Sequence, residues 1–231
     1  MLLDLIYPRR CPVCDKAVKP FGSLICEECK TKVIYVRAPY CQKCGKPLKD
    51  KRAVFCYDCA HKEHYFDRGM ALFAYKSVAD SIYRFKYQGR QEYAAYYAQR
   101  MACILGKRIL ALEPDALVPV PIHRDRKRAR GYNQAEALAK ELGRILNIPV
   151  ETEFIKRVRK TAPMKELSVG ERQNNLKKAF KICYNDVKLS TIIIVDDIYT
   201  TGSTIDAIAY QMRQAGIKNI YFVTLAIGNG I

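Results

Sequence analysis

The stretch TIIIVDDIYTTGSTI, residues 191–205, decides the fold because it joins a strand to a helix. It begins with a run of β-branched residues, which predicts a buried central strand. Two acids, Asp196 and Asp197, follow this run, and the hydroxyl-rich sequence TTGST leads into the helix. Asp and Thr are ordinary residues in strand–helix turns, so one interpretation is a plain turn. The other is a site for a phosphate and a sugar.

The segments on either side alternate between strand and helix patterns. Helical spacing of apolar residues covers 79–110, with a break near Gly89, and also 133–148 and 203–216. Asn133 is the expected N-cap of the helix at 133–148. Residues 160–180 are polar and contain Pro and Gly, which predicts a long loop ending in a helical turn. Strands are expected at 69–77, 115–124, 150–159, 188–197 and 218–228, the second running into a loop after Pro121. This alternation predicts an α/β fold with a doubly wound, mostly parallel sheet.

The first sixty residues have a different pattern, formed by four CxxC pairs that begin 15 residues apart. The pairs are Cys11 with Cys14, Cys26 with Cys29, Cys41 with Cys44, and Cys56 with Cys59. Two CxxC turns supply four thiolates for one tetrahedral metal, and zinc suits this ligand set best. We therefore predict two structural zinc ions, without an open coordination position for catalysis. A small zinc-ribbon module should span residues 1–66, and the α/β domain residues 67–231.

The order in which the pairs combine is less constrained. Sequential ribbons would join the first pair to the second and the third to the fourth, whereas a cross-braced module would interleave them. The short, regular spacing favours sequential ribbons. His61 and His64 follow Cys59 closely and are candidate ligands, but we expect them to be ordinary surface residues.

The chain is strongly basic, with a net charge of +17 over 231 residues. Residues 69–181 hold most of this excess, with 23 basic and 11 acidic residues, whereas residues 182–231 carry 3 and 4. A basic field favours polyanionic partners, although it also keeps a protein soluble. The sequence starts MLLDLIYPRR, which has neither a signal-peptide core nor a cleavage site, and no stretch is long enough for a transmembrane segment. We therefore expect a cytoplasmic protein with reduced cysteines.

The residues of the opening stretch suit one ligand. Gly202 allows close backbone approach at a helix N-terminus, where N–H groups and hydroxyls favour a phosphate monoester. The carboxylates of Asp196 and Asp197 would repel that phosphate, but they suit sugar hydroxyls or a magnesium ion. A ligand that carries a phosphate, a diol and a magnesium-bound pyrophosphate suits both the donor-rich loop and the two carboxylates. In an α/β sheet this site lies where ligands usually bind, at the carboxyl ends of the strands.

The string VDDIYTTGST, residues 195–204, resembles the phosphoribosyl-pyrophosphate (PRPP) motif of type I phosphoribosyltransferases. With the CxxC ribbons, FKYQGR at 85–90, VPVPIHRDRKRARGYNQA at 118–135 and the segment from Arg159 through ERQNN to Phe180, the whole chain resembles the ComF family associated with natural competence. The resemblance implies that Asp196 and Asp197 hold the ribose. It assigns the 5′-phosphate to Thr200, Thr201, Gly202, Ser203 and Thr204.

The resemblance also implies a pyrophosphate loop after residues 118–121 and a flexible hood at 160–178. Met164 departs from the family pattern, where Gln is frequent, and leaves the role of that position open. Departing pyrophosphate carries charge that Arg side chains stabilise through bidentate contacts. We therefore expect Arg124, Arg128 and Arg130 to contact pyrophosphate.

The basic residues exceed what one pyrophosphate needs, so some face solvent or contact a polynucleotide. Rings and cations interleave between Tyr83 and Arg100, a composition typical of single-strand binding, although helical spacing favours a core position for most of the rings. The candidates for nucleic-acid contact are Tyr87, Arg90, Arg126 and Lys127.

Two hypotheses follow from the residues and the resemblance. The first is a PRPP-binding competence protein that handles single-stranded DNA, works with a competence helicase or other DNA-processing proteins, and lies near the uptake machinery at the inner face of the membrane. The second is an active phosphoribosyltransferase that acts on a nitrogenous base in nucleotide salvage. No acceptor signature is evident around 160–178, so the sequence leaves turnover of PRPP open.

Overall fold

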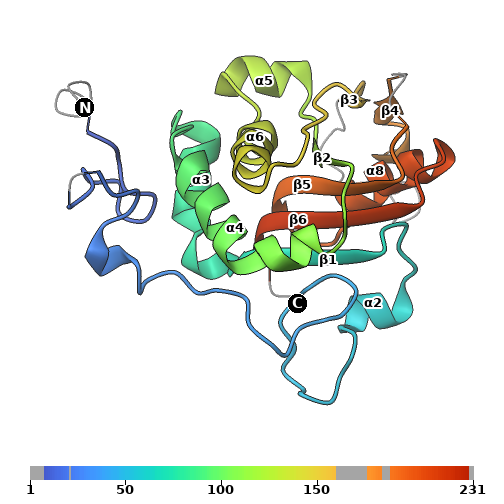
Figure 1. Cartoon of the computed structure of the whole chain (residues 1–231), viewed down its shortest axis with the longest axis horizontal. Coiled ribbons are helices and arrows are strands. Elements are labelled where there is room, and N and C mark those ends of the chain that lie inside the picture. The colour runs from blue at the N-terminus through green and yellow to red at the C-terminus, as the bar shows by residue number, and fades with distance from the viewer. Residues whose placement is uncertain (1–7, 21, 160–175, 184–187, 229–231) are drawn as a thin grey trace, which may run out of the picture.

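A four-stranded parallel sheet forms the centre of the molecule, in the order β1-β6-β5-β2 (Figure 1). The computed structural model describes residues 8–20, 22–159, 176–183 and 188–228. The strands are β1 (Arg68–Ala74), β2 (Ala116–Pro119), β5 (Thr191–Tyr199) and β6 (Asn219–Ile227). The β-branched run of β5 pairs in parallel register with β2 on one side and β6 on the other, as a buried central strand requires.

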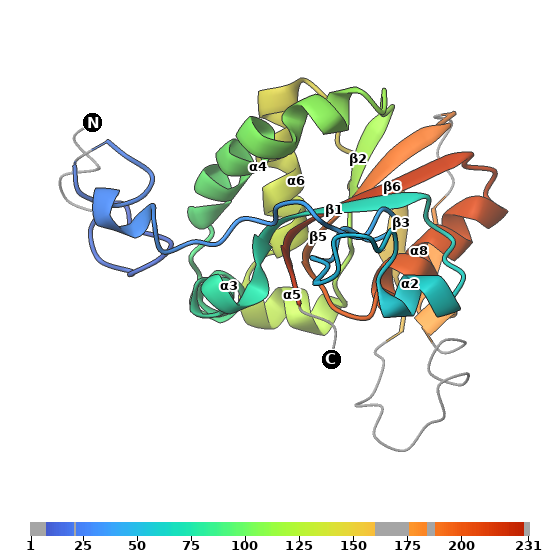
Figure 2. The ribbon, with the colours of Figure 1, turned by 90° about the horizontal axis from the view of Figure 1, so that it is seen from below.

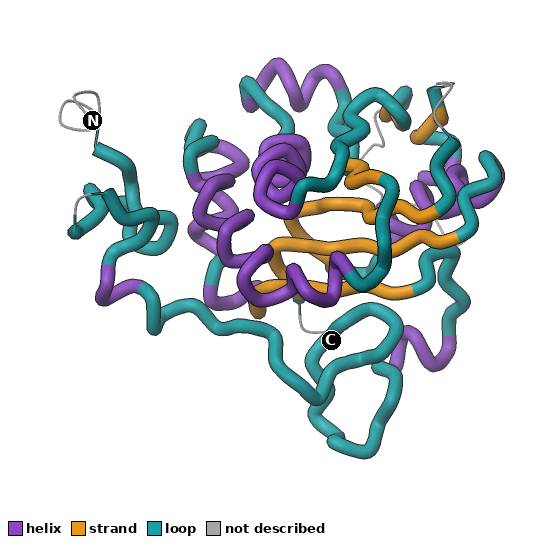
Figure 3. The backbone as a smooth tube through the Cα atoms, in the orientation of Figure 1, coloured by secondary structure: helices purple, strands orange, loops and turns teal. Residues whose placement is uncertain are grey.

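Helices cover both faces of this sheet (Figure 3). On one face lie α3 (Ala79–Tyr87), α4 (Tyr93–Leu110) and α6 (Gln134–Leu146), whose buried side chains share a cluster with Ile193 and Val195 of β5. On the other face, α8 (Ser203–Gln214) packs in a cluster with Ile192 and Ile194. Alternate residues of a strand point to opposite faces, so both faces of β5 are buried. The doubly wound α/β prediction is confirmed.

Three local predictions differ from the structure. The basic run after β2 is a helix, α5 (Arg124–Arg130), because Arg, Lys and Ala favour helix. The His123 side chain caps its start by accepting a hydrogen bond from Asp125 N–H, and Gly131 ends it with φ +81°. The strand predicted at 150–159 is only β3 (Ile155–Arg157), which pairs antiparallel with β4 (Phe180–Ile182) outside the main sheet. Finally, β5 extends past the two acids to Tyr199.

The two cysteine modules lie apart on the α/β domain (Figure 2). We name residues 11–29 ribbon 1 and residues 41–59 ribbon 2. Ribbon 1 contains the short helix η1 (Glu27–Cys29), and α2 (Tyr57–His61) begins within ribbon 2 and ends just after it. The short helix η2 (Tyr75–Ser77) follows β1. The linker between the ribbons runs beside β1, where Val36 N–H donates to Leu72 and Ala74 N–H donates to Ile34, at 2.9 and 2.8 Å. The linker thereby covers the edge of the sheet.

Each ribbon joins a different core. Cys11, Cys26 and Cys29 of ribbon 1 belong to the cluster that contains α3 and α4, whereas Cys41 and Cys44 of ribbon 2 belong to the cluster of α8. Within the described part of the chain, no helix combines the length and apolarity that a membrane span requires.

Candidate functional site

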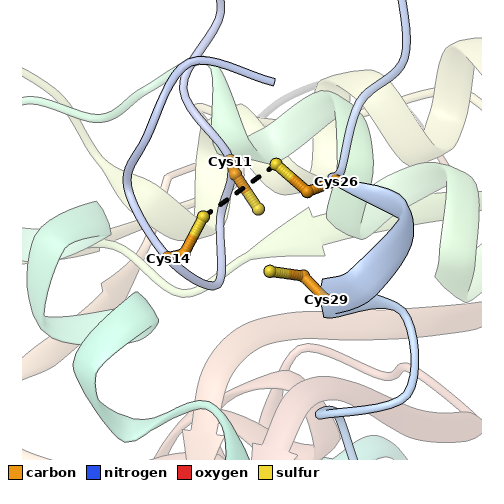
Figure 4. A group of neighbouring side chains, drawn as sticks. All are labelled: Cys11, Cys14, Cys26 and Cys29. Atoms are coloured by element: carbon orange, nitrogen blue, oxygen red, sulfur yellow. Dashed lines mark hydrogen bonds between the residues drawn. The ribbon is translucent and has the colours of Figure 1, made fainter. Parts of the chain in front are cut away.

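The cysteines form two clusters of four, and the clusters are sequential. Cys11, Cys14, Cys26 and Cys29 come together in ribbon 1 (Figure 4), and Cys41, Cys44, Cys56 and Cys59 do so in ribbon 2. Within each cluster the sulfur atoms lie within 4.8 Å of one another. The structure therefore confirms the sequential pairing over the cross-braced alternative.

The clusters fit structural zinc. A tetrahedral zinc with Zn–S bonds of about 2.3 Å separates its sulfurs by about 3.8 Å. The Sγ atoms of Cys14 and Cys26 are 3.9 Å apart, and those of Cys44 and Cys56 are 3.7 Å apart. Burial and the neighbouring thiols raise the pKa of Cys29 to about 12, so holding four thiolates together calls for a cation. When bound, zinc would supply cross-links rather than catalysis.

The two histidines after Cys59 differ. His61 is exposed, as expected, with Nδ1 2.9 Å from the carbonyl oxygen of Tyr57. The side chain of His64 is buried, with 1% of it exposed, so its prediction as an ordinary surface residue is wrong. Its Nε2 lies 3.6 Å from Cys59 Sγ and its Nδ1 lies 2.7 Å from Asp206 Oδ2. His64 thus connects a zinc ligand to α8, a contact that depends on packing between distant segments.

The two acids of the PRPP-like motif lie in the last half of β5. Asp197 N–H donates a hydrogen bond to Asp196 Oδ1 at 2.8 Å. The Oδ1 atom of Asp197 also forms an ion pair with Lys86 Nζ of α3, at 2.8 Å. Burial raises the pKa of Asp196 to about 8, and the adjacent charge of Asp197 adds to the rise. Two adjacent carboxylates with one neighbouring cation suit sugar hydroxyls or a divalent metal.

Two basic residues of this site were missed by the sequence analysis. Lys86 belongs to FKYQGR, which supports the family resemblance and lies in the region of interleaved rings and cations, but neither interpretation pairs it with Asp197. Arg157 of β3 lies in the field of Arg126 and Asp196: burial lowers the pKa of Arg157, Arg126 lowers it further and Asp196 opposes the change. Neither spacing nor composition indicates the Lys86–Asp197 ion pair or the electrostatic influence of Asp196 on Arg157, because α3 and β3 meet β5 only in the folded chain.

The hydroxyl-rich loop at 200–204 follows β5 directly and begins α8. Gly202 is the N-cap residue of α8 and has φ +76°, a conformation that favours glycine. Thr200 and Thr201 are exposed, and the hydroxyls of Thr201 and Ser203 lie 2.9 Å apart. The loop therefore offers hydroxyls and helix N–H groups at the end of β5 that carries Asp196 and Asp197.

The basic residues of α5 divide into two groups. Arg124, Arg126, Lys127 and Arg128 are exposed, with 82% of the Arg124 side chain accessible. Arg130 is half-buried: it donates to Tyr87 Oη at 3.0 Å and to Gln134 Oε1 at 2.9 Å. Arg130 also lies over the ring of Tyr87, at 4.6 Å from its centroid. The structure thus places Arg130 against α3 and α6, and the other four on the surface.

The aromatic residues of α3 and α4 are mostly core, as expected. Phe85, Tyr93, Tyr96 and Tyr97 are buried, whereas Tyr83 and Tyr87 are each 57% exposed and their rings lie 5.2 Å apart. Arg90, a candidate for nucleic-acid contact, instead forms a bidentate ion pair with Asp15 of ribbon 1, at 2.9 and 3.1 Å. Of the candidate hood at 160–178, residues 160–175, with Met164, lie outside the described residues.

Comparison with known proteins agrees with this geometry. The Double zinc ribbon domain family matches residues 2–60, and the Phosphoribosyl transferase domain family matches residues 104–230. The chain is 32% identical to Competence protein F of Haemophilus influenzae over 223 residues, which cover 94% of this chain and 96% of that protein.

Two further relatives cover most of the chain. DNA utilization protein YhgH of Escherichia coli K12 is 29% identical, with 89% of this chain and 85% of the relative covered. Competence protein ComFC of Bacillus subtilis is 25% identical, with 89% and 72% covered. From its cysteine clusters, its parallel sheet and these matches, the chain belongs to the ComF family, in which a double zinc ribbon precedes a phosphoribosyltransferase domain.

Proposed function

We propose that this protein binds PRPP with magnesium and acts on single-stranded DNA during natural transformation. One observation carries the proposal: Asp196 and Asp197 lie near the carboxyl end of one buried strand, and the loop at 200–204, which we call the phosphate-type loop, begins three residues after Asp197. The names of the relatives, competence proteins and a DNA utilization protein, support the biological setting.

The site residues divide the ligand between them. Thr200 to Thr204 would hold the 5′-phosphate, because hydroxyls and helix N–H groups there are donors without negative charge. Asp196 and Asp197 would accept the ribose hydroxyls or contact magnesium. Arg124, Arg128 and Arg130 of the pyrophosphate segment would face the leaving group, and Lys86 would balance the charge of Asp197.

Calorimetric titration with PRPP and Mg²⁺ tests this proposal. We expect saturable binding by the wild-type protein and at least a tenfold weaker affinity for Asp197→Asn, because the uncharged amide loses the charge-assisted hydrogen bonds to the sugar. The matched control is Asp115→Asn. Asp115 accepts bonds from the N–H groups of Ser190 and Thr191 at the opposite end of β5, so its removal should leave PRPP affinity unchanged. Absence of binding by the wild-type protein would refute PRPP as the ligand.

The DNA part of the proposal rests on the exposed face of α5 and the adjacent Tyr83 and Tyr87. Cations beside exposed rings are the groups that neutralise phosphates and stack on bases. We expect a labelled single-stranded oligonucleotide to bind in a salt-dependent manner. The triple variant Arg126→Gln, Lys127→Gln, Arg128→Gln should weaken binding and reduce the salt slope by about 0.7 for each phosphate that the variant no longer neutralises.

The control for this experiment removes the same charge elsewhere. Lys49→Gln, Lys51→Gln and Arg52→Gln neutralise three exposed residues of ribbon 2, so any effect of net charge alone appears in both triple variants. Equal weakening of oligonucleotide binding in the two triple variants would show that α5 is not part of the DNA interface. Binding that does not respond to salt would contradict a phosphate-backbone contact.

A second candidate function is phosphoribosyl transfer to a nitrogenous base in nucleotide salvage. The match to the phosphoribosyltransferase family across 104–230 favours it. Steady release of pyrophosphate from PRPP in the presence of a base, lost in Asp197→Asn, would support catalysis; binding of PRPP without release would support a regulatory role.

The proposal places the protein in the cytoplasm, beside the DNA-uptake machinery at the inner face of the membrane, with a competence helicase or another DNA-processing protein as partner. Fractionation of competent cells should recover part of the protein with membranes in a form that salt releases. Affinity purification from those cells should identify the partner.

A further inference from the structure

The inner side of the phosphate-type loop rests on Tyr199. A methyl group on Gly202 would come within 2.5 Å of Tyr199 Oη and 2.9 Å of Cζ, so the phenol fills the space directly behind the loop. Tyr199 is the last residue of β5 and is 3% exposed. Because Gly202 has no side chain, loop and ring are in direct contact, and a shift of the ring would shift the loop.

Ribbon 2 and the segment after it hold this ring. Tyr199 stacks on Phe222 of β6, with centroids 4.8 Å apart and planes 3° from parallel, and Phe66 meets it edge-on. Lys46 of ribbon 2, only 5% exposed, lies over the ring at 5.9 Å from its centroid and pairs with Asp58 at 2.6 Å. The support of the loop therefore extends into the second cysteine cluster.

A second set of contacts joins the segment directly after ribbon 2 to the first turn of α8. Asp206 is 7% exposed, and its N–H donates to the carbonyl oxygen of Gly202 at 2.8 Å. Its carboxylate lies 3.0 Å from Lys62 Nζ, 2.7 Å from His64 Nδ1 and 3.2 Å from Tyr65 N. These three partners all follow within six residues of Cys59, and His64 also contacts its sulfur. A buried carboxylate with three partners fixes the position of its backbone.

We propose that ribbon 2 is the scaffold that fixes the phosphate-type loop, with Tyr199 and Asp206 as its positioning residues. The inference rests on the proposed ligand, since it gives ribbon 2 a role in binding the 5′-phosphate half of PRPP. Backbone donors bind an anion best when they are held in place beforehand, and a short loop on a surface has little rigidity of its own. Ribbon 2 supplies this rigidity from behind, without touching the ligand.

Ribbon 1 provides the internal comparison. Its anchor, Asp15, pairs with Arg90 and accepts a bond from Tyr93 Oη at 2.6 Å, at the turn between α3 and α4. Asp15→Asn and Asp206→Asn are therefore matched variants: each removes one carboxylate that ties one ribbon to the domain, and each keeps the size of the side chain.

The experiment measures the affinities for ribose 5-phosphate and for magnesium pyrophosphate separately. For Asp206→Asn and for Tyr199→Leu we expect affinity for ribose 5-phosphate to fall at least tenfold and affinity for pyrophosphate to change less than twofold. Asp15→Asn should leave both unchanged. General loss of stability would instead weaken both ligands in all three variants, and unchanged affinity for ribose 5-phosphate in a folded Asp206→Asn would overturn the inference.

Hydrogen exchange separates this inference from the proposed function. Peptides covering 199–208 should exchange faster in Asp206→Asn than in the wild-type protein, whereas Asp15→Asn should leave them unchanged, and this readout needs no ligand. Failure of the wild-type protein to bind either ligand would reject the proposed function, while unchanged exchange would reject the scaffold. If Asp206→Asn does not fold, Lys62→Met removes one partner with a side chain 33% exposed and should give the same result in smaller degree.

Discussion

The two zinc ribbons are alike in sequence and different in position. Both present four cysteines with the same CxxC spacing, and both bring their sulfurs within 4.8 Å. Ribbon 1 packs in the core that contains α3 and α4, whereas ribbon 2 packs in the core of α8 and Tyr199. The cysteines determine only that a ribbon forms. The neighbouring residues, Asp15 in one ribbon and Lys46 in the other, with His64 just after it, determine what each ribbon supports.

The anchors also differ in burial. About a quarter of each side chain in the Asp15–Arg90 pair is exposed, while 10% of the Asp206 side chain and 1% of the His64 side chain are. Solvent weakens an exposed pair, but removing one member of a buried pair leaves a charge without compensation. Ribbon 2 should therefore tolerate substitutions less well than ribbon 1.

Loss of one zinc should have the largest effect. Cys14→Ser and Cys44→Ser each remove one zinc ligand, so bound zinc should fall from about two ions per chain to about one. The ribbon that carries the substitution should then lose the apparent stabilisation of about 10 kcal/mol that a structural zinc can supply. Metal analysis measures the first effect. We expect Cys44→Ser to abolish ribose 5-phosphate binding and Cys14→Ser to retain it. Retention in both would break the distinction between the ribbons.

A methyl group behind the loop should have the next largest effect. Gly202→Ala combines a strained φ with a contact of 2.5 Å to Tyr199 Oη, and we expect at least a tenfold loss of ribose 5-phosphate affinity. Gly89→Ala is the control, because φ is +66° there and nothing lies within 4 Å of the added carbon. It should cost about 1–2 kcal/mol in urea unfolding and leave affinity unchanged. Equal effects on affinity would show that strain alone is responsible.

The Asp15–Arg90 pair should contribute modestly. We expect a coupling free energy of about 1 kcal/mol from a double-mutant cycle with Asp15→Asn and Arg90→Met, because the pair is bidentate but partly exposed. Urea unfolding of the four proteins at one zinc content provides the measurement. A coupling above about 3 kcal/mol would place ribbon 1 in the same class as ribbon 2.

The smallest effect concerns pH and the sugar half of the site. Asp196 has a folded pKa of about 8, against a usual value of 3.8, so the folded protein keeps a proton that the unfolded chain loses between about pH 4 and 8. Stability therefore falls as pH rises through this window, and the proposed magnesium-bound ligand would have to displace the proton.

We expect affinity for Mg²⁺-PRPP to rise severalfold from pH 7 to 9, above the phosphate pKa near 6, and Asp196→Asn to remove this dependence. Tyr199→Leu should lower the affinity for Mg²⁺-PRPP by the same factor at every pH, without moving the pH at which the rise in affinity is half complete. A moved midpoint would mean that ribbon 2 acts on the acids as well as on the loop.

Local sequence patterns were sufficient to predict those elements whose structure depends on residues close together in the chain. The CxxC turns, the central strand at 191–195, the helix N-cap at Asn133 and the glycine at 202 follow from spacing and conformational preference alone. Apolar periodicity could not indicate a helix at Arg124–Arg130, because six of its seven residues are charged and none is buried. The sequence could not assign His64, since the same spacing suits an exposed residue.

The sequence by itself therefore determined two zinc ribbons and a doubly wound α/β domain, and it predicted the residues of one candidate phosphate-and-sugar site. Only the tertiary structure decided that Lys86 faces Asp197, that Arg90 binds Asp15 and that ribbon 2 stands behind the phosphate-type loop. These contacts join residues between 75 and 153 positions apart in the chain. Their formation depends on how the faces of one sheet are covered, and no periodicity of the sequence encodes that arrangement.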